Sequence, residues 1–414
     1  MITFDDVSFA YQGGIPDGSE PPALRHIHFH AERGECIVLC GKSGCGKTTM
    51  LRMVNGLVPH FYQGRLEGDI TVGNVHIKEA SLPQVAAVAG SVFQNPRTQF
   101  FHLDTTGEMA FNMENLNIPH DKMVERLKET AWKLDIQTLM DRDIFQLSGG
   151  EKQQIACGSV YASMPEVIVM DEPSSNLDME SIRKLQDLIR TMKDEGKTIL
   201  ISEHRLWYLE DIADRYVLLK DGQIENEFTS DEILALSLQE LEQSGLRAVR
   251  RKQLWNMGTR TIRQEKDMEK AAFLEIEGLR FSRQMRQVLD INRLAIPKGA
   301  IVAVIGENGA GKSTFALCLC GLLKHHGTVR INGERISNKK LPERAYLVLQ
   351  EPGHQLFSDS VLGELMLNKG TVTETEAVAV LEKMGLAGLE NRHPGSLSGG
   401  QQQRLSLSVA LCTN

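Results

Sequence analysis

Short apolar runs that end abruptly at glycine or at charge recur along the chain. Residues 35–40 and 300–305 each lead into a glycine-rich segment, and residues 167–170 end at two carboxylates. Runs of this length without polar alternation are typical of strands buried in a parallel sheet. After each glycine-rich segment apolar residues return at helical spacing, as at residues 50–54. The pattern predicts an α/β fold in which strand, glycine loop and helix follow one another twice.

The chain carries the same three motifs twice. The first copy comprises a P-loop at 41–48, Gln94 after a strand-like segment, and Leu-Ser-Gly-Gly at 147–150. The second copy comprises a P-loop at 306–313, Gln350 after a strand-like segment at 346–349, and Leu-Ser-Gly-Gly at 397–400. The repeat predicts two domains of one architecture within this chain.

Both P-loops have the composition of a phosphate-binding loop. Their glycines let consecutive backbone N–H groups turn toward phosphate oxygens at a helix N-terminus, whose dipole favours anions. Lys47 and Lys312 would add a positive charge at the β- and γ-phosphates, and Thr48 and Ser313 would offer a hydroxyl to Mg²⁺. The residues predicted to bind nucleotide are Gly41, Ser43, Gly44, Gly46, Lys47, Thr48 and Thr49 in the first copy and Gly306, Asn308, Gly309, Gly311, Lys312, Ser313 and Thr314 in the second.

A P-loop followed by Leu-Ser-Gly-Gly, here called the signature motif, resembles the ABC (ATP-binding cassette) ATPase family. The resemblance implies two P-loop NTPase domains, each with a RecA-like core and a helical subdomain. It also implies that the two cassettes pair head to tail, with each ATP held between one P-loop and the opposite signature motif. Ser148 and Gly150 would then contact the nucleotide of the second P-loop, and Ser398 and Gly400 that of the first.

Polar residues follow the predicted strands, and the resemblance implies their roles. Asp171 would bind Mg²⁺, and Glu172 would be the general base that deprotonates the attacking water. His204, after the apolar run 198–201, would hydrogen-bond the γ-phosphate and that water. Gln94, and Gln350 in the second copy, would ligate Mg²⁺ or hold water.

Three further positions carry two interpretations. Tyr11 and Phe281 follow the first strand-like segment of each copy and would stack on adenine, but aromatic residues there are also common in hydrophobic cores. Cys45 lies inside the first P-loop, where a small filler residue is favoured over a reactive thiol. The sequence leaves the role of the two aromatics open.

Composition restricts the class of protein. The 414 residues carry a net charge of −8, which speaks against nucleic-acid binding, and their 41% hydrophobic content is that of a globular protein. No apolar run is long enough to predict a membrane-spanning helix, and the first residues lack the pattern of a secretory signal. The seven cysteines lack metal-ligand spacing and predict reduced thiols. We expect a peripheral protein on the cytoplasmic face of the cell membrane, attached through partner subunits.

The motifs predict a first domain over 1–228, a charged linker over 229–272 and a second domain over 273–414. Within the linker, residues 231–241 have helical apolar periodicity, and its basic cluster favours a solvated face over a binding patch. The sequence ends at Asn414, after the second signature motif and before the positions of a second acidic strand end and histidine. We expect a truncated second cassette, so that only the first P-loop has every catalytic part.

Finer features resemble the energy-coupling factor (ECF) group of vitamin and metal importers. Residues 92–101, residues 350–357 and Ile-Ser-Glu-His-Arg-Leu at 201–206 carry this resemblance. It implies a membrane-embedded coupling subunit and a substrate-binding membrane protein as partners, docked on the surface around 94–101 and 350–357. Ordinary subdomain packing remains the alternative for these aromatics. A soluble tandem ATPase acting on ribosomes or nucleic acid is the alternative function, disfavoured by the short linker and the scattered cysteines.

Overall fold

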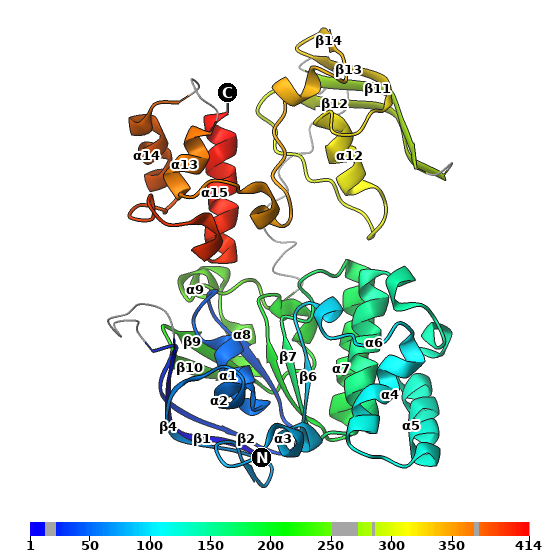
Figure 1. Ribbon diagram of the computed structural model, residues 1–414, viewed down its shortest axis with the longest axis vertical. Coiled ribbons are helices and arrows are strands. Elements are labelled where there is room, and N and C mark those ends of the chain that lie inside the picture. The colour runs from blue at the N-terminus through cyan, green and yellow to red at the C-terminus, as the bar shows by residue number, and fades with distance from the viewer. Residues whose placement is uncertain (13–21, 251–271, 284–285, 368–371, 414) are drawn as a thin grey trace. The chain divides into compact units, whose positions relative to one another are not determined.

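The computed structural model of the chain describes residues 1–12, 22–250, 272–283, 286–367 and 372–413 (Figure 1). The chain divides into two compact units, Met1–Arg260 and Thr261–Asn414. Each unit contains one copy of the three motifs. No helix within the described ranges is long and apolar enough to cross a membrane.

The first unit is built on a six-stranded sheet of order β10-β9-β3-β8-β7-β6. Its strands are β3 (Cys36–Cys40), β6 (Ala89–Val92), β7 (Val167–Asp171), β8 (Thr198–Ser202), β9 (Arg215–Lys220) and β10 (Gln223–Thr229). All pairs are parallel except β9 with β10. Every residue of β3 is buried, with Val38 in one hydrophobic cluster and Ile37 in the other, because successive side chains point to opposite faces of a sheet. The buried strands predicted around 35–40, 167–170 and 198–201 are confirmed.

A second sheet covers one face of the first. Its order is β2-β1-β4-β5, with β1 (Ile2–Tyr11), β2 (Leu24–Ala31), β4 (Gly64–Val72) and β5 (Val75–His76). The pairing is antiparallel throughout. Apolar residues from β1, β2, β3 and α1 (Lys47–Val54) share one hydrophobic cluster. Two short helices, α2 (Leu57–His60) and α3 (Leu82–Val88), complete this half of the unit.

Longer helices cover the other face. They are α4 (Thr105–Asn115), α5 (His120–Lys133), α6 (Gly149–Ala162) and α7 (Met179–Asp194). α6 begins at the signature motif, where Ser148 and Glu151 form a capping box, and Asp178 caps α7. The apolar stripe of α7 is buried in the same cluster as Met109 of α4 and Val38 of β3. Figure 1 shows α4 and α5 beside α6, as expected for a helical subdomain.

Part of the predicted linker is folded in the first unit. Residues 230–243 form α8 (Ser230–Ala235) and α9 (Leu238–Gln243), so the predicted helical character of 231–241 is confirmed as two short helices. Ile233, Leu241 and Val249 are fully buried in the cluster that also contains α7. These apolar side chains attach the segment to the first unit. Most of the predicted basic cluster falls within 251–271, outside the described residues.

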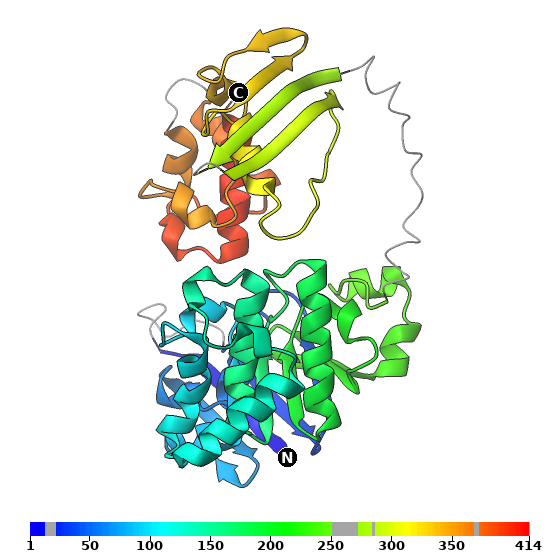
Figure 2. The same ribbon diagram turned by 90° about the vertical axis from the view of Figure 1, so that its right-hand side faces the viewer.

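The second unit repeats the first in part. Its antiparallel sheet has the order β12-β11-β13-β14, with β11 (Ala272–Arg283), β12 (Arg286–Pro297), β13 (His326–Ile331) and β14 (Glu334–Ile336). α12 (Lys312–Leu319) packs on this sheet through Phe315 and Cys318. A separate cluster joins α13 (Val361–Met366), α14 (Glu374–Lys383) and α15 (Gly399–Cys412), which lie together in both views (Figures 1 and 2).

Two predicted strands are absent from the described part of the second unit. Residues 300–305 and 346–349 have no strand pairing, and Ile305 is 89% exposed. In the first unit β3 pairs with β8 and β9, and β6 pairs with β7, and all three partners follow α6 along the chain. Among the described residues of the second unit no strand takes the place of β7, β8 or β9. The prediction is wrong because parallel strands depend on neighbours that are distant in sequence.

Candidate functional site

The first P-loop turns tightly between β3 and α1. Gly41, Gly44 and Gly46 have φ values of 136°, 81° and 109°, and a Cβ on Gly41 would lie 2.2 Å from the carbonyl oxygen of Leu219. Only glycine fits this backbone. Lys47 is 5% exposed, and its Nζ donates to the carbonyl oxygens of Gly41 at 2.9 Å and Lys42 at 3.0 Å. The ammonium group is thereby held inside the loop at the N-terminus of α1, a site suited to phosphate.

A hydroxyl and a carboxylate meet beside this loop. Thr48 Oγ1 donates to Asp171 Oδ1 at 3.2 Å, and Ser202 Oγ donates to the same oxygen at 2.6 Å. Mg²⁺ at nucleotide sites is usually held by one or two protein oxygens together with phosphate oxygens and water. Thr48 and Asp171 fit that requirement. Among the described residues no group of three or more His, Cys, Asp or Glu is placed to hold a metal by itself.

The predicted base lies between the two other predicted polar residues. Glu172 Oε2 accepts from Gln94 Nε2 at 3.0 Å, and Glu172 Oε1 lies 3.2 Å from His204 Nε2. The hydrogen bond with His204 holds the pKa of the Glu172 carboxyl below its ordinary value of 4.5, although burial raises it. Glu172 is therefore ionised near neutral pH. The structure thus brings Gln94, Glu172 and His204 together at the carboxyl ends of β6, β7 and β8.

Glu203 was missed at the sequence level. It is 2% exposed, and its two carboxylate oxygens accept four hydrogen bonds. Arg205, its near neighbour, donates to the carbonyl oxygens of Ser174 at 3.1 Å and Leu177 at 3.3 Å. A charged residue between a wholly buried strand and His204 was the available signal, because a buried carboxylate requires several donors.

The first signature motif is positioned by capping and close packing. Ser148 Oγ accepts from the backbone N–H of Glu151 at 3.3 Å, and Glu151 accepts in return from the N–H of Ser148 at 2.7 Å. Gly150 lies against α7, where a Cβ would be 2.1 Å from Ser181 Oγ. The backbone N–H groups at the start of α6 are thereby held in a fixed orientation.

The second unit repeats these local geometries. Lys312 Nζ donates to the carbonyl oxygens of Gly306 and Glu307, both at 2.7 Å, and Gly309 and Gly311 have positive φ. Ser398 Oγ accepts from the N–H of Gln401 at 3.4 Å and caps α15, which contains Gly400. Ser313 and Thr314 lie in the first turn of α12, and Gln350 lies in an irregular segment. The binding roles of these residues stay predictions.

Tyr11 and Phe281 are both packed against other apolar residues. The Tyr11 ring contacts Phe9 edge-on at 4.8 Å between centroids, and its hydroxyl lies 3.1 Å from Thr49 Oγ1. Phe281 lies in β11, against the cluster that includes α12. Adenine stacking remains a prediction for both.

The segments after Gln94 and Gln350 share one construction. Glu108 Oε2 accepts from the N–H groups of Phe101 and His102 at 2.8 and 2.9 Å. Glu364 Oε2 accepts from those of Phe357 and Ser358 at 2.9 and 2.7 Å. Both loops present an exposed aromatic ring, Phe101 at 73% and Phe357 at 80%. Beside the first loop is a cavity of about 330 Å³, lined by Leu57, Phe93, Gln99, Phe101 and Phe111 among others.

Several known proteins are similar to this chain. Residues 24–175 and 289–414 match the family model described as ABC transporter. A putative ABC transporter ATP-binding protein of Treponema denticola is 40% identical over 99% of this chain and 83% of its own length. A putative HMP/thiamine import ATP-binding protein of Bacillus subtilis is 30% identical over 99% of this chain and 79% of its own length. The solved structure of cbiO1 from Clostridium perfringens, part of the ABC transporter complex cbiONQ, superposes with a TM-score of 0.51 at 25% identity, over 58% of this chain and 94% of that one.

Proposed function

The chain belongs to the ABC transporter family of ATP-binding, ATP-hydrolysing proteins, and we propose that it powers an energy-coupling-factor importer for a vitamin or a metal ion. The observation that carries the proposed chemistry is the cluster in which Glu172 contacts both Gln94 and His204 beside the Thr48–Asp171 pair. The residues proposed as the base, its hydrogen-bonding partners and the Mg²⁺ ligands therefore lie close together beside the first P-loop.

Each residue of this cluster has a proposed step in hydrolysis. The P-loop amides and Lys47 would bind the phosphates, and Thr48 and Asp171 would hold Mg²⁺, which when bound would supply positive charge beside the phosphate oxygens. Glu172, ionised at neutral pH, accepts the proton of the attacking water. His204 orients Glu172 and the water. Gln94 couples the nucleotide site to the loop that follows it, so that a change at the site can move this loop.

The two cassettes are proposed to act as a head-to-tail pair. Ser398 and Gly400 would close the nucleotide site of Lys47, and Ser148 and Gly150 would close that of Lys312. The rigid capping of both signature motifs supports this proposal, since donors fixed before ATP arrives need no reordering on closure.

The aromatic loops after Gln94 and Gln350 are proposed to receive a helix from a membrane-embedded coupling subunit. A cavity lined largely by apolar side chains and an exposed Phe101 suit the apolar face of a short helix. The likeness to cbiO1, part of cbiONQ, and to the thiamine-import relative supports an importer. The protein would then lie at the cytoplasmic face of the membrane.

The catalytic proposal is tested with Glu172→Gln. We expect kcat for ATP hydrolysis to fall by at least about 100-fold, with ATP binding kept, because the amide cannot accept the proton. Glu225→Gln is the matched control, since this surface carboxylate pairs with Lys220 in a partly exposed contact. Undiminished turnover of Glu172→Gln would contradict the role of the base.

The partner proposal is tested by affinity purification from detergent-solubilised cells, with partners identified by mass spectrometry. Phe101→Asp should abolish recovery of a coupling subunit while basal ATP hydrolysis remains. Trp132→Asp, a change at an equally exposed ring (73%) on α5, should retain recovery. Equal recovery with both variants would refute docking at Phe101, and recovery of ribosomes would refute the importer.

A further inference from the structure

We propose that Glu203 is a positioning residue that holds His204, and the segment Ser174–Leu177 after the catalytic strand, in the arrangement required for hydrolysis. The inference rests on the ATPase roles proposed above for Glu172 and His204, and it is independent of the importer assignment. Glu203 is buried, and its proposed effect on hydrolysis passes through His204.

The contacts of Glu203 connect two loops. Its Oε2 accepts from the backbone N–H of His204 at 2.8 Å and of Arg205 at 3.1 Å. Its Oε1 accepts from the backbone N–H of Ser174 at 3.1 Å and from the Tyr208 hydroxyl at 2.8 Å. One carboxylate therefore joins the loop after β8 to the loop after β7.

Arg205 makes the same connection in the opposite sense. Its Nη1 donates to the carbonyl oxygens of Ser174 and Leu177. The N–H of Ser174 is thus bound by Glu203 and its C=O by Arg205, the two residues on either side of His204. Two independent sets of hydrogen bonds hold the loops together, so neither loop shifts without breaking contacts to buried or half-buried charges.

The connection bears directly on the base. Glu172 lies two residues before Ser174, and its backbone N–H donates to the carbonyl oxygen of Ser202, one residue before Glu203. The side chains of Glu172 and His204 then meet at 3.2 Å. Displacing the backbone of His204 by about 1 Å would break that contact, and misplacement of this size is enough to slow an enzyme about 100-fold.

The four donors explain why a carboxylate is required. A glutamine side chain has the same shape but only one acceptor oxygen, so two of the four donors would face an NH₂ group instead. Glu203 is 2% exposed and Tyr208 is 1% exposed, which leaves those donors little access to water as a replacement.

The experiment measures steady-state ATP hydrolysis and ATP affinity of the full chain in a double-mutant cycle. Glu203→Gln should lower kcat at least about tenfold and leave KM for ATP within about twofold, because the P-loop is unchanged. In a His204→Ala background the same change should have little further effect on kcat, since Glu203 acts through His204.

Two further variants separate positioning from folding. Tyr208→Phe removes one of the four donors and should give a smaller loss of kcat that also disappears in the His204→Ala background. This variant replaces Glu203→Gln in the cycle if Glu203→Gln does not fold. Glu35→Gln removes a carboxylate at the opposite end of the core sheet, where it binds Arg215, and should lower the melting temperature with kcat unchanged.

The proposal is overturned by an unchanged kcat in Glu203→Gln, by an unchanged kcat in His204→Ala, or by equal multiplicative losses in the two backgrounds. The last result would mean that Glu203 stabilises the fold without acting through His204. Failure of the proposal that Glu172 is the general base is distinguished from these outcomes, because it would appear as undiminished ATP turnover in Glu172→Gln.

Discussion

At the scale of single residues, the two signature motifs place the same glycine in different surroundings. A Cβ on Gly150 would lie 2.1 Å from Ser181 Oγ and 2.8 Å from Ser181 Cβ, whereas a Cβ on Gly400 would meet nothing within 4 Å. In the first unit the start of α6 lies against α7, so close packing against Ser181 favours glycine at this position.

The difference predicts unequal effects of one substitution on stability. Gly150→Ala should lower the free energy of unfolding by about 1–3 kcal/mol, because the added methyl group overlaps Ser181. Gly400→Ala should be neutral or slightly stabilising, since alanine has the higher helix propensity. Denaturant unfolding followed by circular dichroism measures both, and equal losses would show that the contact with Ser181 is unimportant.

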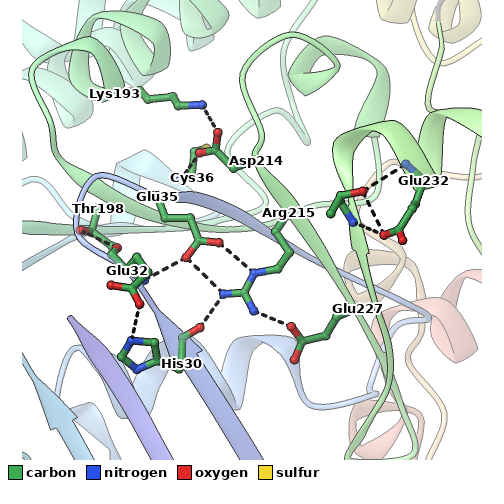
Figure 3. Close-up of polar contacts among 11 residues, drawn as sticks. His30, Glu32, Glu35, Cys36, Lys193, Thr198, Asp214, Arg215, Glu227 and Glu232 are labelled. Carbon is green, nitrogen blue, oxygen red and sulfur yellow. Dashed lines mark hydrogen bonds and ion pairs between the residues drawn. The ribbon is translucent and has the colours of Figure 1, made fainter.

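At the scale of elements, Arg215 joins the two sheets of the first unit (Figure 3). From the start of β9 its guanidinium contacts Glu35 before β3 at 2.9 Å, Glu227 on β10 at 2.5 Å and the carbonyl oxygen of His30 on β2 at 2.5 Å. Nearby, Asp214 accepts from the N–H of Cys36 and pairs with Lys193. These contacts satisfy polar groups at the end of the core sheet opposite the P-loop.

Removal of Arg215 is therefore expected to destabilise the first unit. Arg215→Ala should cost about 2–3 kcal/mol, because charge-assisted hydrogen bonds are lost and Glu35 keeps a half-buried, unpaired charge. Lys220→Ala is the control on the same strand, where the pair with Glu225 is more exposed to solvent and its loss should change stability far less. Thermal unfolding in low salt distinguishes the two, and comparable losses would contradict a joining role.

At the scale of the whole molecule, the two units differ in how far the segment before each P-loop is protected from solvent. All five residues of β3 are buried between β8 and β9. The equivalent segment 300–305 has no strand partner in the described residues, and its Ile301 and Ile305 side chains face solvent. A segment with unpaired backbone groups and exposed apolar side chains is accessible to proteases and to pairing with other strands.

Limited proteolysis should reveal this difference. Thermolysin, which cleaves before large apolar residues, is expected to cut first within 301–305 and to leave 36–40 intact. Mg²⁺-ATP should further protect the first unit, because a ligand that binds only the folded state stabilises it. Mass spectrometry of the fragments gives the order of the cleavages. An early cut within β3 would contradict the prediction that this strand is better protected than 301–305.

The sequence by itself determined the repeated motifs, the α/β class, the family resemblance and the residues from which the catalytic cluster is built. These follow from local information: glycines that need positive φ, apolar runs of strand length, and polar residues at strand ends. Tertiary structure alone decided which strands form, because 300–305 and 346–349 have strand-like sequences but lack neighbours in the described chain. It also decided the role of Glu203, whose four donors come from residues 174 to 208 and meet only when β7 and β8 lie side by side. Hydrogen-bond partners of a buried charge are set by the fold, and no local pattern names them.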